Sequence, residues 1–246
     1  HVGLRRRMTS PADNAIDKVT TLTFDIFGTV LDLAGSLIPP LKELLIRIEA
    51  NSSITGEAVW AHWRQRQRIE QYQDNLLMLG HSGYLAVKRR ALIYTLRSHK
   101  IDFTSDQIDE FMKSYQNLSP FQDAVDGLSR LEKKYKLVML SNGEQWYLEH
   151  LANNQIGIEF QKIISAQSVG QFKPHPAVYR FASQKLGLEP SQIMMVAAHS
   201  FDILGARHSG FRGAYVNRYD LPYDESDYKP DFTTTSFLEL CDQLAV

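Results

Sequence analysis

Cysteine and long apolar runs are both scarce in this sequence. Cys241 is the only cysteine, so no intramolecular disulfide can form and no cluster of thiolates is available to a metal. The longest apolar runs, such as 137–140 and 193–198, are far shorter than the roughly 20 residues that a membrane-spanning helix needs. The three arginines at 5–7 precede no apolar stretch, so they do not form a secretory signal. We therefore expect a reducing, cytoplasmic environment and no membrane partner.

An excess of charge of one sign is also missing. The 246 residues carry a formal net charge of -1, with 22% charged and 43% hydrophobic residues. This balance gives no electrostatic preference for nucleic acid, which is not an expected partner. The histidines away from the motifs described below show no shared ligand spacing, so no metal site is expected among them; they are His62, His150, His175 and His208.

Short apolar, β-prone runs alternate with helical segments over much of the chain. The first run, 22–24, ends at Asp25 and is followed by Gly28-Thr29, which bends the chain away. Further strands are expected at 136–140, 163–164, 193–197 and 213–216, with helices that include 177–186 and 203–208. This alternation predicts an α/β fold with a doubly wound parallel sheet, whose ligands bind beyond the carboxyl ends of the strands.

Residues 36–117 show helical spacing instead of this alternation. Leu41, Leu44, Leu45 and Ile48 recur on one face, as expected for an amphipathic helix. We therefore expect an α/β core domain formed by 18–35 and 118–246, with a helical cap domain inserted at 36–117.

Polar residues that suit nucleophilic chemistry follow the expected strands. A carboxylate such as Asp25 can attack carbon or phosphorus, and an ammonium such as Lys173 keeps it ionised and in position. The hydroxyls of Thr29 and Ser141 can bond the nucleophile or an anionic substrate, and the helix start after Ser141 favours bound anions. Lys173-Pro174 also fits a simple loop boundary, because proline restricts the residue before it.

Four segments in chain order resemble the motifs of the haloacid dehalogenase superfamily. They are 24–29 with Asp25 and Thr29, 140–143 with Ser141 and Asn142, Lys173-Pro174 with Tyr179, and 196–206 with Asp202. The resemblance covers nearly the whole chain. It implies a Rossmann-like core with Asp25 as the nucleophile, whereas Tyr179 fits structural packing nearly as well as a bond to Asp25.

Two departures separate the chain from the magnesium-dependent phosphatases of that superfamily. Phe27 occupies the place of their second aspartate, and Ala198 and Phe201 occupy the places of an additional acidic residue that holds magnesium. Because few hard oxygen ligands remain, neither a metal nor another cofactor is expected. A phosphatase acting on a small phosphomonoester is the less favoured alternative.

The segment Trp63-Arg64-Gln65-Arg66-Gln67 resembles a cap helix of the L-2-haloacid dehalogenases. By that resemblance Arg64 and Asn142 face the leaving halide, Ser141 and nearby amides hold the substrate carboxylate, and the remaining substrate contacts come from Ile26, Phe27, Tyr179 and Phe201. Arg64 also fits a solvated position in a basic stretch. Trp60 and Trp63 favour packing of the cap over substrate contact.

The resemblance implies hydrolytic dehalogenation of a short (S)-2-haloalkanoic acid, haloacetate and fluoroacetate included, to the 2-hydroxy acid. Asp25 would displace the halide, and water would hydrolyse the resulting ester. The family pattern nominates Asp202 as the base for this water. His199 and Ala197 stand where the family usually has asparagine and serine, so His199 either assists Asp202, donates to Asp25 or is only a loop residue.

Two further alternatives follow from the sequence. The same chemistry would open a strained-ring carboxylate. A binding or scaffold module is disfavoured, because Asp25, Thr29, Ser141, Lys173 and Asp202 are all retained. A homodimer is expected mainly from the resemblance, helped by an apolar cap face that includes Leu44, Leu45, Ile48 and Trp60.

Overall fold

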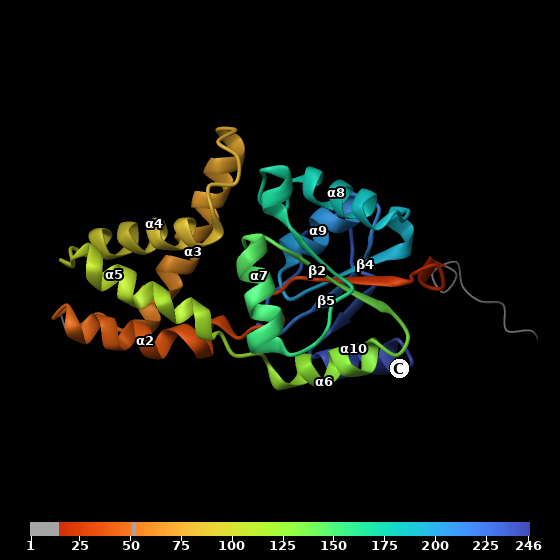
Figure 1. Cartoon of the computed structure of the whole chain (residues 1–246), viewed down its shortest axis with the longest axis horizontal. Coiled ribbons are helices and arrows are strands. Elements are labelled where there is room, and N and C mark those ends of the chain that lie inside the picture. Colours follow the sequence, from red (N-terminus) through yellow and green to blue (C-terminus); the bar gives the residue numbers. More distant parts are fainter. Residues whose placement is uncertain (1–14, 51–52) are drawn as a thin grey trace, which may run out of the picture.

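The computed structural model describes residues 15–50 and 53–246, so the arginine-rich start lies outside the described residues. A six-stranded parallel sheet with the strand order β3-β2-β1-β4-β5-β6 forms the centre of the fold (Figure 1). The strands are β1 (Thr21–Phe24), β2 (Lys136–Ser141), β3 (Lys162–Ser165), β4 (Ile193–Ala197), β5 (Arg212–Val216) and β6 (Phe232–Thr234). The predicted α/β class with a doubly wound parallel sheet is confirmed.

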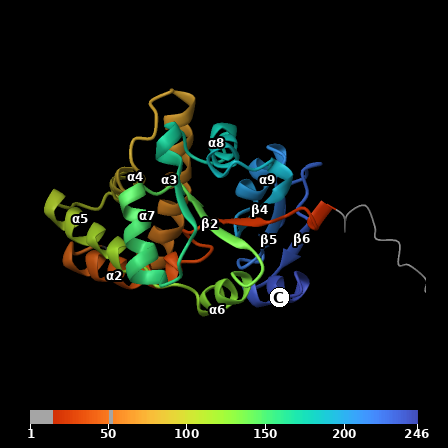
Figure 2. The same ribbon diagram turned by 45° about the vertical axis from the view of Figure 1, so that its right-hand side comes forward.

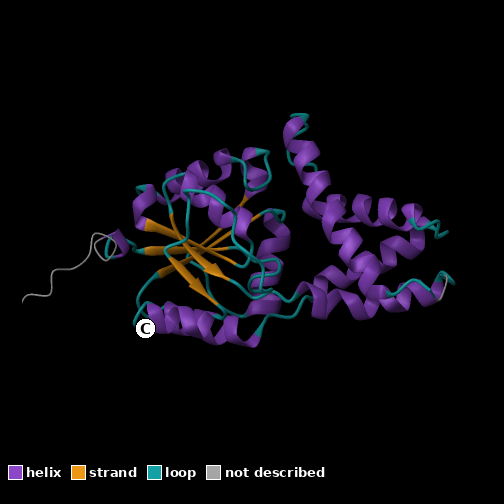
Figure 3. Cartoon of the chain, turned by 180° about the vertical axis from the view of Figure 1, so that it is seen from behind, coloured by secondary structure: helices purple, strands orange, loops and turns teal. Residues whose placement is uncertain are grey.

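Helices cover both faces of this sheet, as Figures 2 and 3 show. One face packs against α6 (Gln122–Leu131), α7 (Gln145–Leu151) and α10 (Phe237–Gln243), and the other against α8 (Pro176–Leu186) and α9 (Ser200–His208). Short turns of helix complete the connections: η2 (Ala152–Ile156), η3 (Ala166–Val169) and η4 (Pro190–Gln192). Buried strand residues alternate between the two faces, because successive side chains of a strand point in opposite directions. In β2, for example, Met139 joins one apolar cluster and Leu140 the other.

The helical insertion follows β1 and lies to one side of the sheet (Figure 3). It consists of α2 (Leu33–Arg47), α3 (Gly56–Leu76), α4 (Tyr84–Ser98), α5 (Ser105–Met112) and the short η1 (Lys113–Asn117). Helix α2 begins earlier than the expected boundary at 36, because the Asp32 side chain accepts a hydrogen bond from Gly35 N at 2.9 Å and caps the helix. None of the described helices is both long and apolar enough to span a bilayer.

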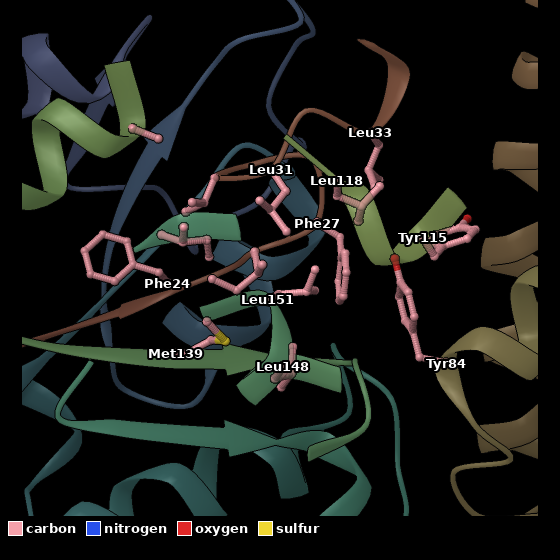
Figure 4. Packing of buried hydrophobic residues seen from close by; sticks show 14 of the residues in the cluster. Phe24, Phe27, Leu31, Leu33, Tyr84, Tyr115, Leu118, Met139, Leu148 and Leu151 are labelled. Atoms are coloured by element: carbon pink, nitrogen blue, oxygen red, sulfur yellow. The ribbon is translucent and has the colours of Figure 1, made fainter. Parts of the chain in front are cut away.

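One apolar cluster runs from the sheet into the insertion. Phe24 and Met139 belong to it on the sheet side, and Phe27 stacks on Tyr84 of α4 with ring centroids 4.1 Å apart (Figure 4). Leu44 and Leu45 are buried in the same cluster. The apolar face that was expected to support a homodimer is therefore largely covered by the chain itself, and the homodimer stays a prediction.

Strand β6 was not among the strands expected from the sequence. It has only three residues, of which Thr233 is exposed, and it pairs in parallel with β5 at the edge of the sheet. So short a run carries almost no periodicity, and its pairing with β5 defines it.

Candidate active site

Asp25 follows β1 directly and lies at the carboxyl edge of the sheet. Its backbone N–H donates to Val196 O at 3.0 Å, which extends the pairing with β4 by one residue. The Thr29 hydroxyl donates to Asp25 Oδ2 at 2.6 Å and accepts from Ala198 N at 2.9 Å. Thr29 therefore fixes the Asp25 carboxylate against the end of β4.

Lys173 is almost completely buried beneath this carboxylate, with 2% of its surface exposed. Its Nζ donates to Asp25 Oδ1 at 3.2 Å, Asp202 Oδ2 at 2.6 Å and Leu140 O at 2.8 Å. Burial lowers the pKa of Lys173, but the charges of Asp202 and Asp25 more than offset it, so this pKa lies above its ordinary value. The lysine is held as an ammonium ion.

The same contacts keep Asp25 ionised. Burial raises the pKa of Asp25, whereas Lys173, His199 and Thr29 lower it, and the net effect puts this pKa far below its usual range. A carboxylate that stays ionised and is held by three donors is a suitable nucleophile.

Asp202, the first acidic residue of α9, is fully buried. Tyr179 donates its hydroxyl proton to Asp202 Oδ1 at 2.6 Å, and Lys173 occupies Oδ2. Burial raises the pKa of Asp202, Lys173 opposes this, and Asp25 adds to it; the result lies above the ordinary value. Tyr179 therefore contacts Asp202, and not Asp25 as one interpretation of the sequence had it.

His199 lies beside the nucleophile, with Nδ1 at 3.0 Å from Asp25 Oδ2. Its ring stacks with those of Phe201 and Tyr219, whose centroids are 5.7 and 6.0 Å away. Gly28 makes room for it: a Cβ there would meet His199 Cε1 at 2.9 Å, and the φ of +83° also favours glycine.

A small cavity of about 50 Å³ opens above Asp25, between the sheet edge and the helical insertion. This volume fits a ligand of only a few non-hydrogen atoms, since a single water needs roughly 10–15 Å³ on the same measure. The described residues that line it are Asp25, Phe27, Arg64, Gln67, Arg68, Gln71, Tyr84, Lys88, Asn142, His199 and Phe201.

Comparison with known proteins identifies the family. The family model described as haloacid dehalogenase-like hydrolase matches residues 19–210. The chain belongs to this family.

Individual relatives agree with the predicted resemblance to the L-2-haloacid dehalogenases, which is confirmed. The haloacetate dehalogenase H-2 of Moraxella sp. (strain B) is 27% identical over 88% of this chain and 93% of its own length. An (S)-2-haloacid dehalogenase of Xanthobacter autotrophicus is 30% identical over 81% of this chain and 76% of its own length. A solved structure of a defluorinating L-2-haloacid dehalogenase is 28% identical, with a TM-score of 0.80 over 93% of this chain and 96% of that one.

The predicted site residues of this haloacid dehalogenase-like hydrolase fall into two groups. The first group lines the cavity and comprises Asp25, Phe27, Arg64, Asn142, His199 and Phe201. The second lies behind these residues and does not line it; it comprises Ile26, Thr29, Ser141, Lys173, Tyr179 and Asp202. The predicted role of Ser141 in holding a substrate carboxylate is therefore not supported by a place in the cavity, since its Oγ is buried and accepts from Gly143 N at 3.4 Å.

Arg64 projects from α3 into the cavity, so it is not merely a solvated residue of a basic stretch. Its NH1 donates to Gln67 Oε1 at 2.8 Å, and its guanidinium lies 5.8 Å from the centre of the Trp60 ring. Arg66, two residues further on, instead pairs with Glu70 and covers the Tyr94 ring. The helical period thus separates Arg64 from Arg66.

Several cavity residues of α3 and α4 were missed by the sequence interpretation. The most informative is Lys88, which is only 3% exposed and whose Nζ lies 4.2 Å from the centre of the Tyr84 ring. The sequence held a signal for it: Lys88 shares a helical face with Tyr84, Ala91 and Leu92, which are all buried. A lysine on the apolar face of a helix needs an explanation. The other missed residues are Gln67, Arg68, Gln71 and Tyr84.

The donor set of the site does not suit a divalent cation. Lys173 Nζ stands between the Asp25 and Asp202 carboxylates and bonds both. Magnesium prefers an octahedral shell of oxygen ligands, which Ala198 and Phe201 cannot supply. No group of three or more His, Cys, Asp or Glu side chains in the described part of the chain is arranged to hold a metal.

Proposed function

We propose that this chain is a hydrolytic dehalogenase that converts a short (S)-2-haloalkanoic acid into the 2-hydroxy acid and halide. The observation that carries the proposal is the Asp25 carboxylate, held ionised by Lys173 and His199 at the floor of a cavity that Arg64 also lines. The names of the relatives, an (S)-2-haloacid dehalogenase and a haloacetate dehalogenase among them, support it.

In the first step an oxygen of Asp25 attacks the carbon that bears the halogen. The carbon–halogen bond breaks, and the halide leaves with its electron pair. Arg64 and Asn142 supply a cation and an amide donor for the departing anion. Phe27 and Phe201 form apolar walls that limit water near the reacting carbon. The product of this step is an ester of Asp25.

In the second step water attacks the carbonyl carbon of that ester, and the bond between this carbon and the ester oxygen breaks. The hydroxy acid leaves with an oxygen that belonged to Asp25, and water restores the carboxylate. We assign the proton of this water to His199, which lines the cavity 3.0 Å from Asp25. Asp202, the residue that the family pattern nominates, has both oxygens bonded to Lys173 and Tyr179.

The proposal also divides the work between the two parts of the chain. The core domain at 18–35 and 118–246 provides the nucleophile and its partners, and the cap domain at 36–117 provides Arg64. The Phe27–Tyr84 stack is one of the contacts that join the two parts.

The test is release of halide in buffer with EDTA. Each enantiomer of 2-chloropropionate, and fluoroacetate separately, is incubated with the wild-type chain and with Asp25→Asn. We expect chloride from the (S) enantiomer that requires Asp25 and is insensitive to EDTA. A single turnover in ¹⁸O-labelled water should leave the label in Asp25 and not in the first product. Absence of halide from every substrate, or phosphomonoester hydrolysis that requires magnesium, would overturn the proposal.

A further inference from the structure

Three cations line the cavity, and none of them is paired with a carboxylate. Arg64, Arg68 and Lys88 form no ion pair within 4.0 Å among the described residues. Of the described lining residues, only Asp25 is a carboxylate, and Lys173 and His199 already bond it. The cavity therefore holds more positive charge than its own walls compensate.

Two other arginines of the same helices, outside the cavity, do pair with carboxylates. Arg66 of α3 pairs with Glu70 at 3.0 Å, and Arg90 of α4 reaches Glu70 at 3.5 Å and Asp74 at 3.4 Å. These two arginines, which do not line the cavity, have acidic partners, whereas Arg68 and Lys88 contact aromatic rings: Phe201 for Arg68 at 4.6 Å and Tyr84 for Lys88.

Lys88 carries the largest electrostatic cost of the three. Burial lowers its pKa, Arg64 and Arg68 lower it further, and Glu144 and Asp25 oppose them, with a result well below the ordinary value. Glu144 is the nearby acid on the core side, but it does not line the cavity and its Oε1 accepts from Leu85 N. A buried cation without a partner is destabilising, unless a bound anion completes it.

A further donor in the cavity also lacks a partner. Gln67 is 1% exposed and lines the cavity; its Oε1 accepts from Arg64, but Nε2 has no hydrogen-bond partner among the described residues. Buried amide groups are normally satisfied. An amide donor beside three cations is suited to bind anionic oxygen atoms.

The number of these groups exceeds what a 2-haloalkanoate needs. The proposed function assigns Arg64 to the leaving halide, and one further cation satisfies the α-carboxylate. Resting on that function, we infer that the substrate is a short 2-halo-dicarboxylate, whose two carboxylates bind Lys88 and Arg68. Arg68 and Arg64 also line an adjoining cavity of about 310 Å³ with Trp60 and Tyr219, which gives room for the longer end of such a substrate.

The test compares a dianionic with a monoanionic substrate of the same reacting carbon. Chloride release is measured for each enantiomer of 2-chlorosuccinate and 2-chloropropionate at constant ionic strength. We expect kcat/KM of the wild-type chain to be about tenfold or more higher for the preferred chlorosuccinate, the size of one charge-assisted hydrogen bond. Arg68→Met should bring the ratio of the two values close to one.

Arg66→Met is the matched control. It removes one positive charge from the same helix, two residues away, but from the face that does not line the cavity, and Glu70 keeps Arg90 as a partner. The ratio should be unchanged in this variant. If both variants lost the preference for chlorosuccinate, this preference would be a long-range effect of charge. The assignment of a substrate carboxylate to Arg68 would then be overturned.

A binding measurement makes the inference independent of turnover. Succinate and propionate are titrated calorimetrically into Asp25→Asn, and succinate should bind about tenfold tighter, with the difference lost in Asp25→Asn with Arg68→Met. Equal affinities together with equal kcat/KM values overturn the dicarboxylate and leave the dehalogenase. No chloride from any substrate overturns the dehalogenase, and the affinities then still decide whether the cavity takes a dianion.

Discussion

The two walls of the cavity differ in how their charges are compensated. On the sheet edge, Lys173 bonds both Asp25 and Asp202. Thr29 and Tyr179 donate to the other oxygen of each carboxylate. On the helical side, the cations that line the cavity have aromatic and amide neighbours but no acidic partner among the described residues.

The charges of the sheet edge are compensated when the chain folds, whereas the cations of the helical wall are compensated only when an anionic ligand binds. A network that is satisfied within the chain holds the nucleophile ready and stabilises the fold, whereas unpaired cations favour anion binding and cost stability. We therefore expect substitutions on the sheet edge to lower stability and activity together. Substitutions on the helical wall should lower activity while leaving the fold as stable or more so.

Lys173→Met is expected to have the largest effect. It removes the cation that bonds two buried carboxylates, and breaking such a pair costs about 3–5 kcal/mol. Urea denaturation at pH 7 should show this loss in the free energy of unfolding, and chloride release should disappear.

Lys136→Met is the control, because Lys136 is an exposed residue of β2. A Lys173→Met chain as stable as the control would contradict the view that the sheet edge is held together by this ammonium.

Arg64→Met should reduce activity nearly as strongly without lowering stability. Loss of a donor that stabilises developing negative charge typically lowers kcat by about 10²–10³-fold, or about 2.7–4 kcal/mol. Steady-state chloride release gives kcat, and the thermal midpoint Tm should stay within about 2 °C of the wild type. An unchanged kcat would move the halide site from Arg64 to another cation of the same wall.

Tyr179→Phe is expected to have an intermediate effect on the sheet edge. The substitution removes the 2.6 Å bond to Asp202 Oδ1 but leaves Lys173 on Oδ2. A bond to a charged group contributes about 1.5–3 kcal/mol, and the free energy of unfolding should fall by the lower figure, with KM unchanged. Tyr223→Phe, which removes a partly exposed bond to Tyr228 O, should change it less. Equal losses in the two variants would show that the bond to the buried Asp202 contributes no more to the free energy of unfolding than the partly exposed bond does.

The sheet edge could be predicted from the sequence, and the helical wall only in part. Short β-prone runs followed by Asp25, Ser141 or His199 define strand ends whose position in a parallel sheet is fixed by topology, so five strands were located to within about one residue at most bounds. Which residues a separate set of helices turns toward that edge depends on packing between segments. Arg64 was found through its motif, whereas Arg68 was not.

Lys88 shows why the sequence predicts the helical wall only in part. Its helical face predicts burial, but burial alone does not tell whether a lysine meets a carboxylate, an aromatic ring or a ligand. In the structure it meets the Tyr84 ring and the cavity. A polar residue on an apolar helical face is thus a reason to search for a site, and the chemistry follows only from the residues that other segments bring to it.

Lys88→Met tests the helical wall through the pH dependence of stability. The pKa of Lys88 lies well below its ordinary value in the fold and near 10.4 in the unfolded chain. A base whose pKa is lower in the fold destabilises it fully below the folded pKa, and this cost fades as the pH rises toward the unfolded pKa. Lys88→Met should therefore be more stable than the wild type at pH 7, by roughly 1 kcal/mol or 2–4 °C in Tm, with the gain shrinking toward pH 10.

The comparison of Tm at pH 7 and pH 10 isolates Lys88, because the other groups titrate alike in both chains. Lys133→Met, at an exposed lysine outside the cavity, should show no such convergence. Succinate should raise Tm of the wild type more than that of Lys88→Met, since a ligand stabilises a fold in proportion to its affinity. A Lys88→Met chain that is less stable at pH 7 and stays so at pH 10 would mean that the ammonium is compensated within the fold. The charge of Lys88 would then be compensated within the fold, as the charges of the sheet edge are, and the proposed difference between the two walls would be wrong.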